Sequence, residues 1–428
     1  MDRSWPIEKL GHTARIGNGS TPRRDSTIYW GSGDVPWLNS SVVNESRVTR
    51  AEQFVTVAAL RECHLPVVAP GSVLVGLTGQ GKTRGMATIL DIEATLNQHV
   101  AYVTPDLSRW FPEYLLWSLR AAYDALRCLS EENGSTKGGL TCEALKQFRL
   151  TVPPIRYQRA IAAYLDRETA RIDTLIEEQQ RLIEMLRERR KALIEKAVFA
   201  GLWNAATNNH PESWLPPTPV HWRVVQLGFM CDTLAGYAFP SDAFSIDEAH
   251  ARLLRGVNVK PGRIDWTETV CWDTEASAVP SEYELEAGDL VFGMDRPFVG
   301  GGVRVAAISN SDLPALLLQR VMRIRPTAEG DRGYVRYVMS TDAFFDYLEP
   351  LFTGVSVPHV SEWQVRKFKM PFPPLDEQRS IAAHLDEVTE KIDQLIAETE
   401  RFVDLARERR AALITAAVTG QIDVREAA

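Results

Sequence analysis

A stretch after Pro153-Pro154 carries the clearest pattern of apolar and polar positions in the chain. No Pro or Gly follows this pair until Gly201. Apolar residues recur in between at steps of 7, 4, 7, 3, 7 and 4, at Leu165, Ile172, Ile176, Ile183, Leu186, Leu193 and Ala197. Steps of three or four within a seven-residue period are typical of a helix with one apolar seam. The pattern predicts a single long helix.

The same pattern recurs 220 residues later, after Pro373-Pro374. The seam is preserved at Leu385, Ile392, Ile396, Val403, Ala406, Leu413 and Ala417. Fixed-offset self-similarity signals a duplicated structural unit. Each predicted helix would be a rod of roughly 65 Å. A lone rod would expose its apolar stripe, so we expect the two helices to pack as an antiparallel coiled coil.

The two segments that precede the long helices are also related to each other. Gly71-Ser72-Val73-Leu74-Val75-Gly76 is echoed by Gly288-Asp289-Leu290-Val291-Phe292-Gly293, at an offset of 217. Each segment reads as short β-branched strands with Gly and Pro turns, followed by one short helix, over Pro112–Leu129 and Gly333–Pro350. The sequence therefore predicts an α+β protein with a pseudo-two-fold internal repeat, in which two similar modules are separated by the long helices.

These boundaries give five expected segments. Residues 203–219 are rich in Asn, Pro and Thr, as turns and loops are, so we expect them to form a linker. The segments are a first module (residues 1–151), a first long helix (152–202), a linker (203–219), a second module (220–371) and a second long helix (372–428).

Composition excludes several classes of protein. No apolar run approaches the roughly 20 residues that span a bilayer. The first residues lack the pattern of a secretory signal, so we expect a cytoplasmic protein. Five cysteines are scattered with no C-x-x-C pair, which argues against a zinc site or a disulfide framework. Cys128 and Cys142 have no recognisable partner that would make either a nucleophile.

The net charge is −8, which argues weakly against binding nucleic acid. Its distribution is uneven. Residues 1–150 carry 16 Lys/Arg and 15 Asp/Glu, whereas residues 203–370 carry 15 and 21. If the protein binds DNA, it must use local basic loops, and a partner must supply much of the phosphate neutralisation.

Gly76-Leu77-Thr78-Gly79-Gln80-Gly81-Lys82-Thr83 fits the pattern G-x-x-x-x-G-K-[ST] of a phosphate-binding loop. Such a loop needs a helix directly after the Lys-Thr pair. Here Arg84-Gly85-Met86-Ala87 reads as a turn and a strand, and the second module has no Lys-Thr at the equivalent place. We therefore interpret the segment as a variable glycine-rich hairpin. Isolated histidines such as His99 are expected to be structural or solvated.

Several motifs together resemble the specificity (S) subunit of type I restriction–modification systems. They are Gly19-Ser20-Thr21-Pro22, Tyr29-Trp30-Gly31 and Pro36-Trp37-Leu38 in the first module, with Leu253 to Asn258 as an alternative version in the second. The Pro-Pro-x-x-x-Gln-Arg-x-Ile-Ala motif at the start of each long helix is the most specific part. Arg156-Tyr157-Gln158 departs from the family's acidic-Glu-Gln, which Asp376-Glu377-Gln378 keeps.

The resemblance implies a non-catalytic subunit that recognises a bipartite, asymmetric target in double-stranded DNA. Each module would read one half-site in the major groove, and the helices would set the spacer between the half-sites. Two modification (methyltransferase) subunits and two restriction (translocase and nuclease) subunits are the implied partners. No cofactor is expected in this chain, because S-adenosylmethionine, ATP and Mg would belong to those partners.

Arg and Lys suit guanine, and Asn and Gln suit adenine. On this basis the residues expected to contact DNA are Ser20, Thr21, Arg23, Arg24, Asn39, Ser40, Gln80, Lys82, Arg84, Lys137, Arg255, Asn258, Lys260, Arg263, Arg296, Gln319, Arg320 and His359. Trp30 and Trp37 are expected to pack in a core or hairpin. The residues expected in the coiled coil or in partner docking are Leu165, Ile172, Ile176, Ile183, Leu186, Arg189, Leu193, Leu385, Ile392, Ile396, Val403, Arg409 and Leu413.

Three other functions stay open at the level of sequence. The same fold could serve a stand-alone methyltransferase or another phage-defence complex. An NTPase would use Lys82, and ATP hydrolysis that Lys82→Ala abolishes would support it. A coiled-coil scaffold with no DNA role would give no sequence-dependent gel shift, with or without a methyltransferase partner.

Overall fold

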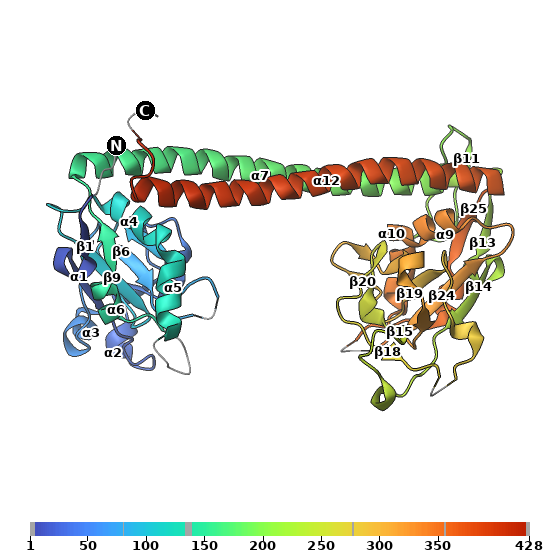
Figure 1. Cartoon of the computed structure of the whole chain (residues 1–428), viewed down its shortest axis with the longest axis horizontal. Helices are drawn as coiled ribbons and strands as arrows, with labels where there is room; N and C mark the ends of the chain where they lie inside the picture. The colour runs from blue at the N-terminus through green and yellow to red at the C-terminus, as the bar shows by residue number, and fades with distance from the viewer. Residues whose placement is uncertain (1–4, 80, 133–138, 276–277, 355–356, 425–428) are drawn as a thin grey trace. The chain divides into compact units, whose positions relative to one another are not determined.

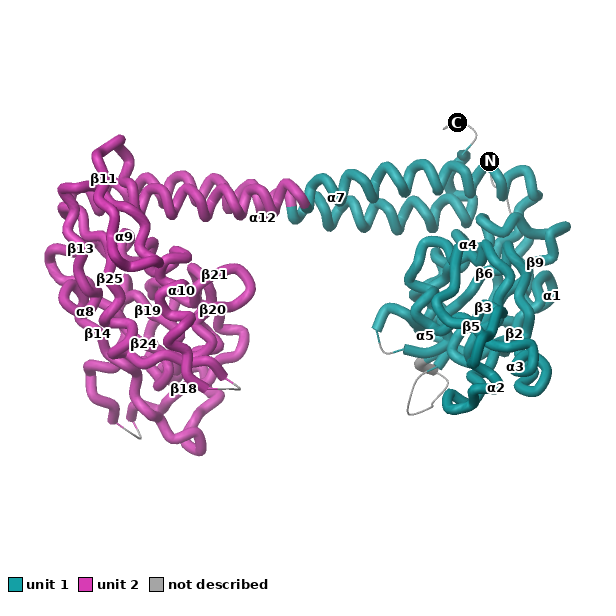
Figure 2. The backbone as a smooth tube through the Cα atoms, turned by 180° about the vertical axis from the view of Figure 1, so that it is seen from behind, with its two compact units in different colours: residues 1–180, 400–428 teal, residues 181–399 magenta. Residues whose placement is uncertain are grey.

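The computed structural model describes residues 5–79, 81–132, 139–275, 278–354 and 357–424 (Figure 1). The chain divides into two compact units (Figure 2). Unit 1 comprises residues 1–180 and 400–428, and unit 2 comprises residues 181–399. Each unit contains one α+β module together with a segment of each long helix.

Unit 1 is built on a mostly antiparallel sheet of five strands. Their order is β2 (Ala14–Asn18), β9 (Val100–Pro105), β6 (Val73–Gly76), β7 (Ala87–Leu90) and β4 (Arg47–Val48). A second sheet has the order β5 (Gln53–Val55), β3 (Val35–Leu38) and β8 (Thr95–Leu96), and β1 (Ile7–Lys9) pairs with β10 (Arg149–Thr151). The strands β6 and β7 are buried along their whole length, and apart from Gly76 and Thr88 their residues are apolar.

Unit 2 repeats this topology, except that its main sheet has four strands and no counterpart of β4. Its main sheet has the order β14 (Cys231–Ala235), β24 (Val321–Pro326), β19 (Leu290–Gly293) and β22 (Val305–Ala307). A second sheet has the order β18 (Cys271–Trp272), β15 (Ala251–Leu254) and β23 (Ala315–Leu317), and β13 (Arg223–Gln226) pairs with β25 (Lys369–Phe372). In both units the second sheet joins one antiparallel and one parallel pair. The internal repeat expected from the sequence is therefore seen in the structure, because corresponding strands have the same neighbours in both units.

Short elements complete the modules. In unit 1 they are α1 (Leu10–Thr13), α2 (Thr27–Trp30), η1 (Ser40–Asn44), α3 (Val57–Glu62) and α6 (Cys142–Gln147). In unit 2 they are β11 (Thr207–Asn208), β12 (Thr218–Pro219), α8 (Leu227–Met230), η2 (Ser241–Ala243), η3 (Gly256–Asn258), β16 (Val259–Lys260), β17 (Arg263–Ile264), η4 (Ser281–Tyr283), β20 (Phe298–Val299), β21 (Gly302–Val303), η5 (Asn310–Asp312), η6 (Glu349–Leu351) and α11 (Glu362–Arg366).

The short helix predicted in each module is two helices. Unit 1 has α4 (Pro112–Ala121) and α5 (Tyr123–Glu132), and unit 2 has α9 (Arg332–Met339) and α10 (Asp342–Leu348). In unit 2 the break has a local cause. The hydroxyls of Ser340 and Thr341 donate to carbonyls of the preceding turn, and Thr341 has extended backbone. Such side-chain bonds compete with the helical backbone pattern.

The long helices are α7 (Ile155–Ala200) and α12 (Leu375–Val418). In each unit a segment of one lies beside a segment of the other (Figure 2). The core of unit 1 contains Leu165 near the start of α7 and Val418 at the end of α12. The core of unit 2 contains Leu385 near the start of α12 and Val198 near the end of α7. The helices therefore form an antiparallel coiled coil.

A buried glutamine fixes the start of each long helix. Gln158 and Gln378 are fully buried, and each makes three hydrogen bonds. The Nε2 of Gln158 donates to the carbonyls of Pro153 and Arg109, and its Oε1 accepts from Phe111 N, all at 2.7 Å. Gln378 bonds in the same way to Pro373 O, Glu329 O and Asp331 N. These bonds explain why glutamine recurs after both Pro-Pro pairs.

The residue before this glutamine differs between the two units. In unit 2, Glu377 accepts a hydrogen bond from Trp222 Nε1 at 2.8 Å and contacts His221 Nε2 at 2.9 Å. In unit 1, Tyr157 takes the place of the glutamate and packs on Trp5, with ring centroids 6.3 Å apart. The departure from the acidic-Glu-Gln pattern thus accompanies a change from a polar to an aromatic contact.

Two equivalent ion pairs join the long helices. Arg410 pairs with Asp173 at 2.7 Å in unit 1, and Arg190 pairs with Asp393 at 2.8 Å in unit 2. Each pair is the copy of the other at the offset of 220. Both arginines end a repeated Arg-Glu-Arg-Arg motif, over residues 187–190 and 407–410, whose charges the apolar seam predicts on the outside of the helix pair. The last arginine of each motif instead bonds across to the other helix. A shift of one helix along the other would separate the paired charges, so the two ion pairs favour the observed alignment of α7 with α12.

Candidate nucleic-acid interface

Unit 1 gathers polar side chains at one edge of its main sheet, where β6 ends and β9 begins. These strands are antiparallel neighbours, so the two points lie at the same edge. The hydroxyl of Thr21 donates to Gln98 Oε1 at 2.7 Å. Gln98 Nε2 lies 3.1 Å from His99 Nε2, and His99 Nδ1 lies 2.9 Å from Thr78 Oγ1. One chain of hydrogen bonds therefore connects four side chains at this edge.

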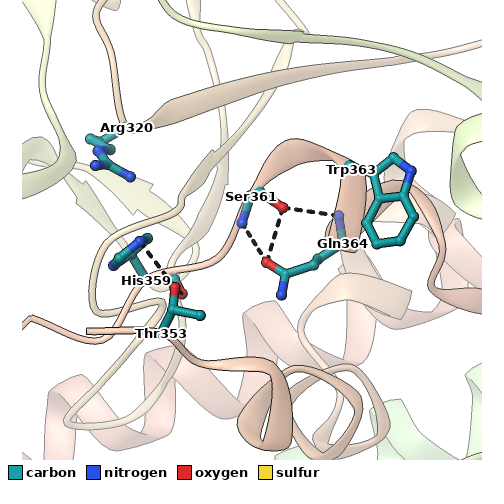
Figure 3. A pocket seen from close by; sticks show the side chains of 6 residues that line it. All are labelled: Arg320, Thr353, His359, Ser361, Trp363 and Gln364. Atoms are coloured by element: carbon teal, nitrogen blue, oxygen red, sulfur yellow. Dashed lines mark hydrogen bonds between the residues drawn. The ribbon is translucent and has the colours of Figure 1, made fainter. Parts of the chain in front are cut away.

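Unit 2 has an equivalent edge, where β19 ends and β24 begins. Asp295 follows β19, and Arg320 directly precedes β24. The Nε of Arg320 lies 3.8 Å from Asp295 Oδ1. In Figure 3, Arg320 lies on one side of a hollow of about 410 Å³ whose other lining residues are Thr353, His359, Ser361, Trp363 and Gln364.

Hydrogen bonds hold the wall of this hollow in place. His359 Nε2 lies 3.0 Å from Thr353 Oγ1, and the backbones of these two residues bond in both directions. Ser361 and Gln364 form a capping box at the start of α11, so their side chains are engaged with each other and with the backbone (Figure 3). The hollow is therefore a formed feature with one arginine and one histidine facing it.

The backbone frame around both edges is the same. In unit 1, Leu77 N donates to His99 O at 2.9 Å, and Leu140 N donates to Leu77 O at 2.9 Å. In unit 2, Met294 N donates to Arg320 O at 2.9 Å, and Val360 N donates to Met294 O at 3.0 Å. Position 99 is therefore structurally equivalent to position 320, and position 78 to position 295.

The unit 2 edge holds two arginines in a left-handed backbone conformation. The φ angles are 44° at Arg296 and 68° at Arg320. Residues other than glycine rarely adopt such angles, and where they do the strain often marks a functional site. Arg296 N donates to Pro358 O at 2.7 Å, so the strained backbone is held by the segment that also carries His359.

A buried arginine supports the same loop from behind. Arg304 is 6% exposed, and its guanidinium donates to the carbonyls of Val259 and Asp295 at 2.9 and 2.7 Å. Burial lowers the pKa of Arg304 from its ordinary value, and the nearby Asp295 opposes this effect. Arg304 thus positions the backbone of Asp295 and leaves the Asp295 carboxylate to face Arg320.

The residues predicted to contact DNA in unit 1 lie in different environments. Thr21 belongs to the chain of hydrogen bonds at the sheet edge. Arg24 lies over the rings of Trp30 and Trp37, with its guanidinium carbon 4.3 and 4.6 Å from their centroids. Three other predicted residues make contacts within unit 1: Ser20 with Cys63 O, Arg23 with Asp25, and Asn39 with Ser41 N. Of the remaining three that the structure describes, Ser40 begins η1, the Lys82 side chain is exposed, and Arg84 is buried. Trp37 is 2% exposed, which confirms its expected packing role.

In unit 2 the prediction also mixes exposed and enclosed residues. Asn258 is fully buried, and its Nδ2 donates to the carbonyls of Asp265 and Glu268. Arg255 donates to the same Glu268 carbonyl at 2.6 Å. These two side chains therefore hold a loop together. The other predicted residues are exposed or half-buried, namely Lys260, Arg263, Arg296, Gln319, Arg320 and His359.

Gln80 and Lys137 lie outside the described residues. Sequence reasoning did not single out Thr78, Gln98, His99 or Asp295. The sequence pattern presents His99 as isolated, whereas the fold gives His99 two side-chain neighbours. The missing signal was the echo of Asn97-Gln98-His99-Val100 in Leu318-Gln319-Arg320-Val321, at an offset of 221, which aligns His99 with Arg320.

The loop that fits a phosphate-binding pattern is held in a different way. After Lys82 and Thr83 the chain turns into β7, and no helix starts there. The hydroxyl of Tyr123 donates to Lys82 O, and Arg127 donates to Gly81 O at 2.7 Å. Side chains of α5 thus occupy backbone carbonyls of the loop. A helix N-terminus that could face phosphate groups does not follow the Lys-Thr pair.

The long helices carry two kinds of apolar side chain. The predicted seam residues are buried or half-buried, and Ile172 and Ile176 pack on Val403 and Ala406 in unit 1. Arg189 and Arg409 are exposed. A second apolar set is also exposed, and its members correspond at the offset of 220: Leu175, Leu182 and Met185 on α7, and Leu395, Phe402 and Leu405 on α12.

Among the residues that the structure describes, no group of three or more His, Cys, Asp or Glu side chains could hold a metal ion. None of the described helices is both long enough and apolar enough to cross a membrane.

Comparison with protein families gives one match that covers most of the chain. A profile described as "Type I restriction modification DNA specificity domain" matches residues 3–185 and 260–401. The chain is 27% identical over 320 residues to the MjaVIII specificity subunit of Methanocaldococcus jannaschii, covering 73% of this chain and 70% of that protein. It is 32% identical over 178 residues to the EcoAI specificity subunit of Escherichia coli, covering 41% of this chain and 30% of that protein.

Two solved structures share the fold at 16% sequence identity. One is a chain from a study of complex assembly and conformational transition in a type I R-M system, with a TM-score of 0.75 and 98% of each chain covered. The other is the HsdS subunit from Thermoanaerobacter tengcongensis, with a TM-score of 0.58, covering 99% of this chain and 98% of that one.

Proposed function

The chain belongs to the type I restriction–modification DNA specificity family, and from this premise we propose how its parts divide the work. It is a DNA sequence-specificity subunit, and it is non-catalytic. The observation that carries the detailed proposal is the equivalence of the two sheet edges. The same backbone frame presents Thr78 and His99 in unit 1 and Asp295 and Arg320 in unit 2. A shared frame with different side chains suits two modules that read different sequences.

In this proposal each module reads one half of a bipartite, asymmetric target in double-stranded DNA. The modules are residues 1–151 and 220–371, the helical segments are 152–202 and 372–428, and residues 203–219 are the linker. The lengths of α7 and α12 would set the non-specific spacer between the half-sites. The DNA contacts would come from the predicted residues named above, among which the exposed side chains around Thr21, Lys82, Arg296 and Arg320 have the best access.

We propose that the exposed apolar sets on α7 and α12 receive modification subunits. Leu175, Leu182 and Met185 are spaced by seven and three residues, which places them on one face of the helix. Leu395, Phe402 and Leu405 repeat that face on the second helix. Two equal faces suit two copies of one partner with an apolar helix. S-adenosylmethionine would belong to these methyltransferase subunits, and ATP and Mg to two restriction subunits.

The central test replaces one module. The full chain is expressed with its methyltransferase subunit, and the methylated motif is determined by long-read sequencing. Replacing residues 1–151 with the matching module of a relative should change one half of the motif and leave the other half intact. A change in both halves would contradict independent modules, and the absence of any bipartite motif in the parent complex would contradict the proposed function.

The docking faces need a separate test. Met185→Asp and Leu405→Asp should each weaken capture of the methyltransferase subunit, and the double variant should abolish it. Glu184→Gln, at an exposed position on a different face of α7, is the control for a changed helix surface. Adding the restriction subunit tests whether it joins the same complex. Failure of that subunit to bind would favour the stand-alone methyltransferase alternative.

A further inference from the structure

Equivalent positions in the two units differ in side-chain chemistry where their backbone hydrogen bonds correspond. Positions 99 and 320 each directly precede a strand of their main sheet, and each accepts a hydrogen bond from the residue after the neighbouring strand. Position 99 is a histidine among neutral side chains, and position 320 is an arginine beside an aspartate. The frame therefore offers the same place with two different sets of donors and acceptors.

Arg320 is arranged so that its terminal nitrogens remain available. Its side chain is 53% exposed, and its contact with Asp295 is through Nε at 3.8 Å. The carboxylate therefore lies beside the Nε edge of the guanidinium. The two Nη groups are the part of an arginine that matches the O6 and N7 acceptors of guanine. A carboxylate beside the other edge restricts the rotation of the guanidinium and so reduces the entropy that is lost on binding.

In unit 1 the equivalent position carries His99 in place of an arginine. Gln98 Oε1 accepts a hydrogen bond from the Thr21 hydroxyl, so the other end of the amide, Nε2, faces His99 Nε2 as a donor. His99 Nε2 must then be the acceptor, which places the ring proton on Nδ1, where it donates to Thr78 Oγ1. His99 is neutral in this arrangement, and the Thr78 hydroxyl keeps its own proton for an outside acceptor.

We propose that position 320 is a specificity-determining position, and that Arg320, braced by Asp295, recognises a guanine in the half-site read by unit 2. Its counterpart in unit 1, the chain Thr21–Gln98–His99–Thr78, reads its half-site through neutral hydrogen bonds. This inference rests on the proposed function and deepens it. It assigns a base type to one residue and a paired role to Asp295, His99 and Thr78.

The test uses the full chain with its methyltransferase subunit. The motif of the parent complex is determined first, and binding is then measured on duplexes in which each motif position is replaced in turn. Arg320→Gln should lose roughly 5- to 150-fold in affinity for the motif, the range for one bidentate contact with a base. The loss should be confined to one guanine position, at which the variant should no longer discriminate. The other half-site should be unchanged.

Asp295→Asn is the companion variant, because it keeps the shape and removes the bracing charge. It should weaken discrimination at the same base position by less than Arg320→Gln does. In the double variant, discrimination should be little weaker than in Arg320→Gln alone. Arg223→Gln is the matched control, since Arg223 forms an exposed pair with Glu329 in the same unit. It should leave the motif as it is.

Two outcomes would overturn the assignment. If Arg320→Gln weakens binding equally to all duplexes and lowers the salt dependence by about one phosphate, Arg320 contacts the backbone and no base. If the variant keeps the full preference of the parent, position 320 does not set specificity. In both cases the proposed function would still hold if the parent complex recognises a bipartite motif. If the parent complex recognises no such motif, the proposed function itself is wrong.

Discussion

The two units keep their internal hydrogen bonds and differ in their charges. Gln158 and Gln378 make matching bonds, and the tyrosines at 114 and 334 each donate to two carbonyls, one of them at the end of a long helix. Burial raises the pKa of both tyrosine hydroxyls, which therefore act as donors. In contrast, residues 1–150 have nearly balanced charge, with 16 basic and 15 acidic residues, whereas residues 203–370 have 15 and 21.

The acidic surplus of unit 2 is accompanied by buried or partly buried ion pairs. Arg325 bonds to the fully buried Asp289, and Arg323 bonds to Asp232. The guanidinium groups of Arg323 and Arg325 are therefore engaged in ion pairs within unit 2. Arg320 and Arg296 are exposed and lie at the sheet edge. The difference teaches that, after duplication, the hydrogen bonds at the starts of the long helices are kept, while the charges of the modules diverge both at the surface and in buried pairs.

The largest expected effect tests whether the frame is equally important in both units. Gln158→Ala and Gln378→Ala each remove three buried hydrogen bonds and leave backbone groups without partners. Each should cost about 3 kcal/mol of unfolding free energy. Hydrogen exchange should place the loss in unit 1 for the first variant and in unit 2 for the second. Gln180→Ala, at an exposed position of α7, is the control. Clearly unequal costs would mean that the starts of α7 and α12 are not equivalent.

A smaller effect is expected where the starts of the two helices differ. Glu377→Tyr deprives the buried Trp222 Nε1 of its acceptor and should cost about 1–2 kcal/mol. The reverse exchange, Tyr157→Glu, removes one aromatic contact with the half-buried Trp5 and should cost about 1 kcal/mol or less. Thermal unfolding measures both. The comparison would fail if Tyr157→Glu were the more damaging change, and Glu390→Tyr, on the exposed face of α12, is the control.

The ion pairs between the helices should have a weaker effect because they are partly exposed. Double-mutant cycles on Arg410 with Asp173, and on Arg190 with Asp393, should each give a coupling of about 0.2–1 kcal/mol. The coupling should fall as salt is added. Exchanging the charges within one pair should restore most of the stability that a single reversal removes. No coupling in either cycle would show that the apolar seam alone determines the alignment.

The smallest effect concerns pH and is expected in unit 2. Burial raises the pKa of Glu195, although the carboxylate accepts a hydrogen bond from Asp342 N. A group whose pKa is higher in the folded state binds its proton more tightly there, so stability falls as the pH rises through its titration. Glu195→Gln keeps an acceptor and has no charge to bury. Its melting temperature should exceed that of the parent at pH 8, with the difference shrinking towards pH 4; a difference that is constant with pH would contradict this.

The sequence predicted the parts of the fold that depend on local periodicity. The Pro-Pro pairs and the glycines at 201 and 420 bracket α7 and α12, and the seam explains their pairing. The predicted short helices over 112–129 and 333–350 were wrong in one respect, since each is interrupted. Near Thr341 the hydroxyl bonds of Ser340 and Thr341 are local, but the hydrogen bond that Glu195 accepts from Asp342 N comes from a distant helix, which no local pattern contains.

The candidate site was less predictable because it depends on which side chains the fold leaves accessible. Asn258 has the right amide for reading adenine, yet the fold closes a loop around it. His99 looked isolated because its partner Thr78 is 21 residues away in the sequence. Alignment of the two copies pairs position 99 with position 320. The repeat that relates the long helices therefore also relates the strand ends, where the side chains differ most.

The end of α12 has a practical consequence for handling the protein. Gly420 takes a left-handed conformation with a φ of 78°, and a side chain there would collide with the ring of Trp5. The first and last described stretches therefore meet at one corner of unit 1. An affinity tag or fluorescent protein fused at either end of this chain would therefore lie close to the contact between Trp5 and Gly420 in unit 1. In unit 2 the matching contact is between Gly201 and Trp222, on either side of the linker, so a label intended for unit 2 can be inserted at an exposed linker position such as Asn209.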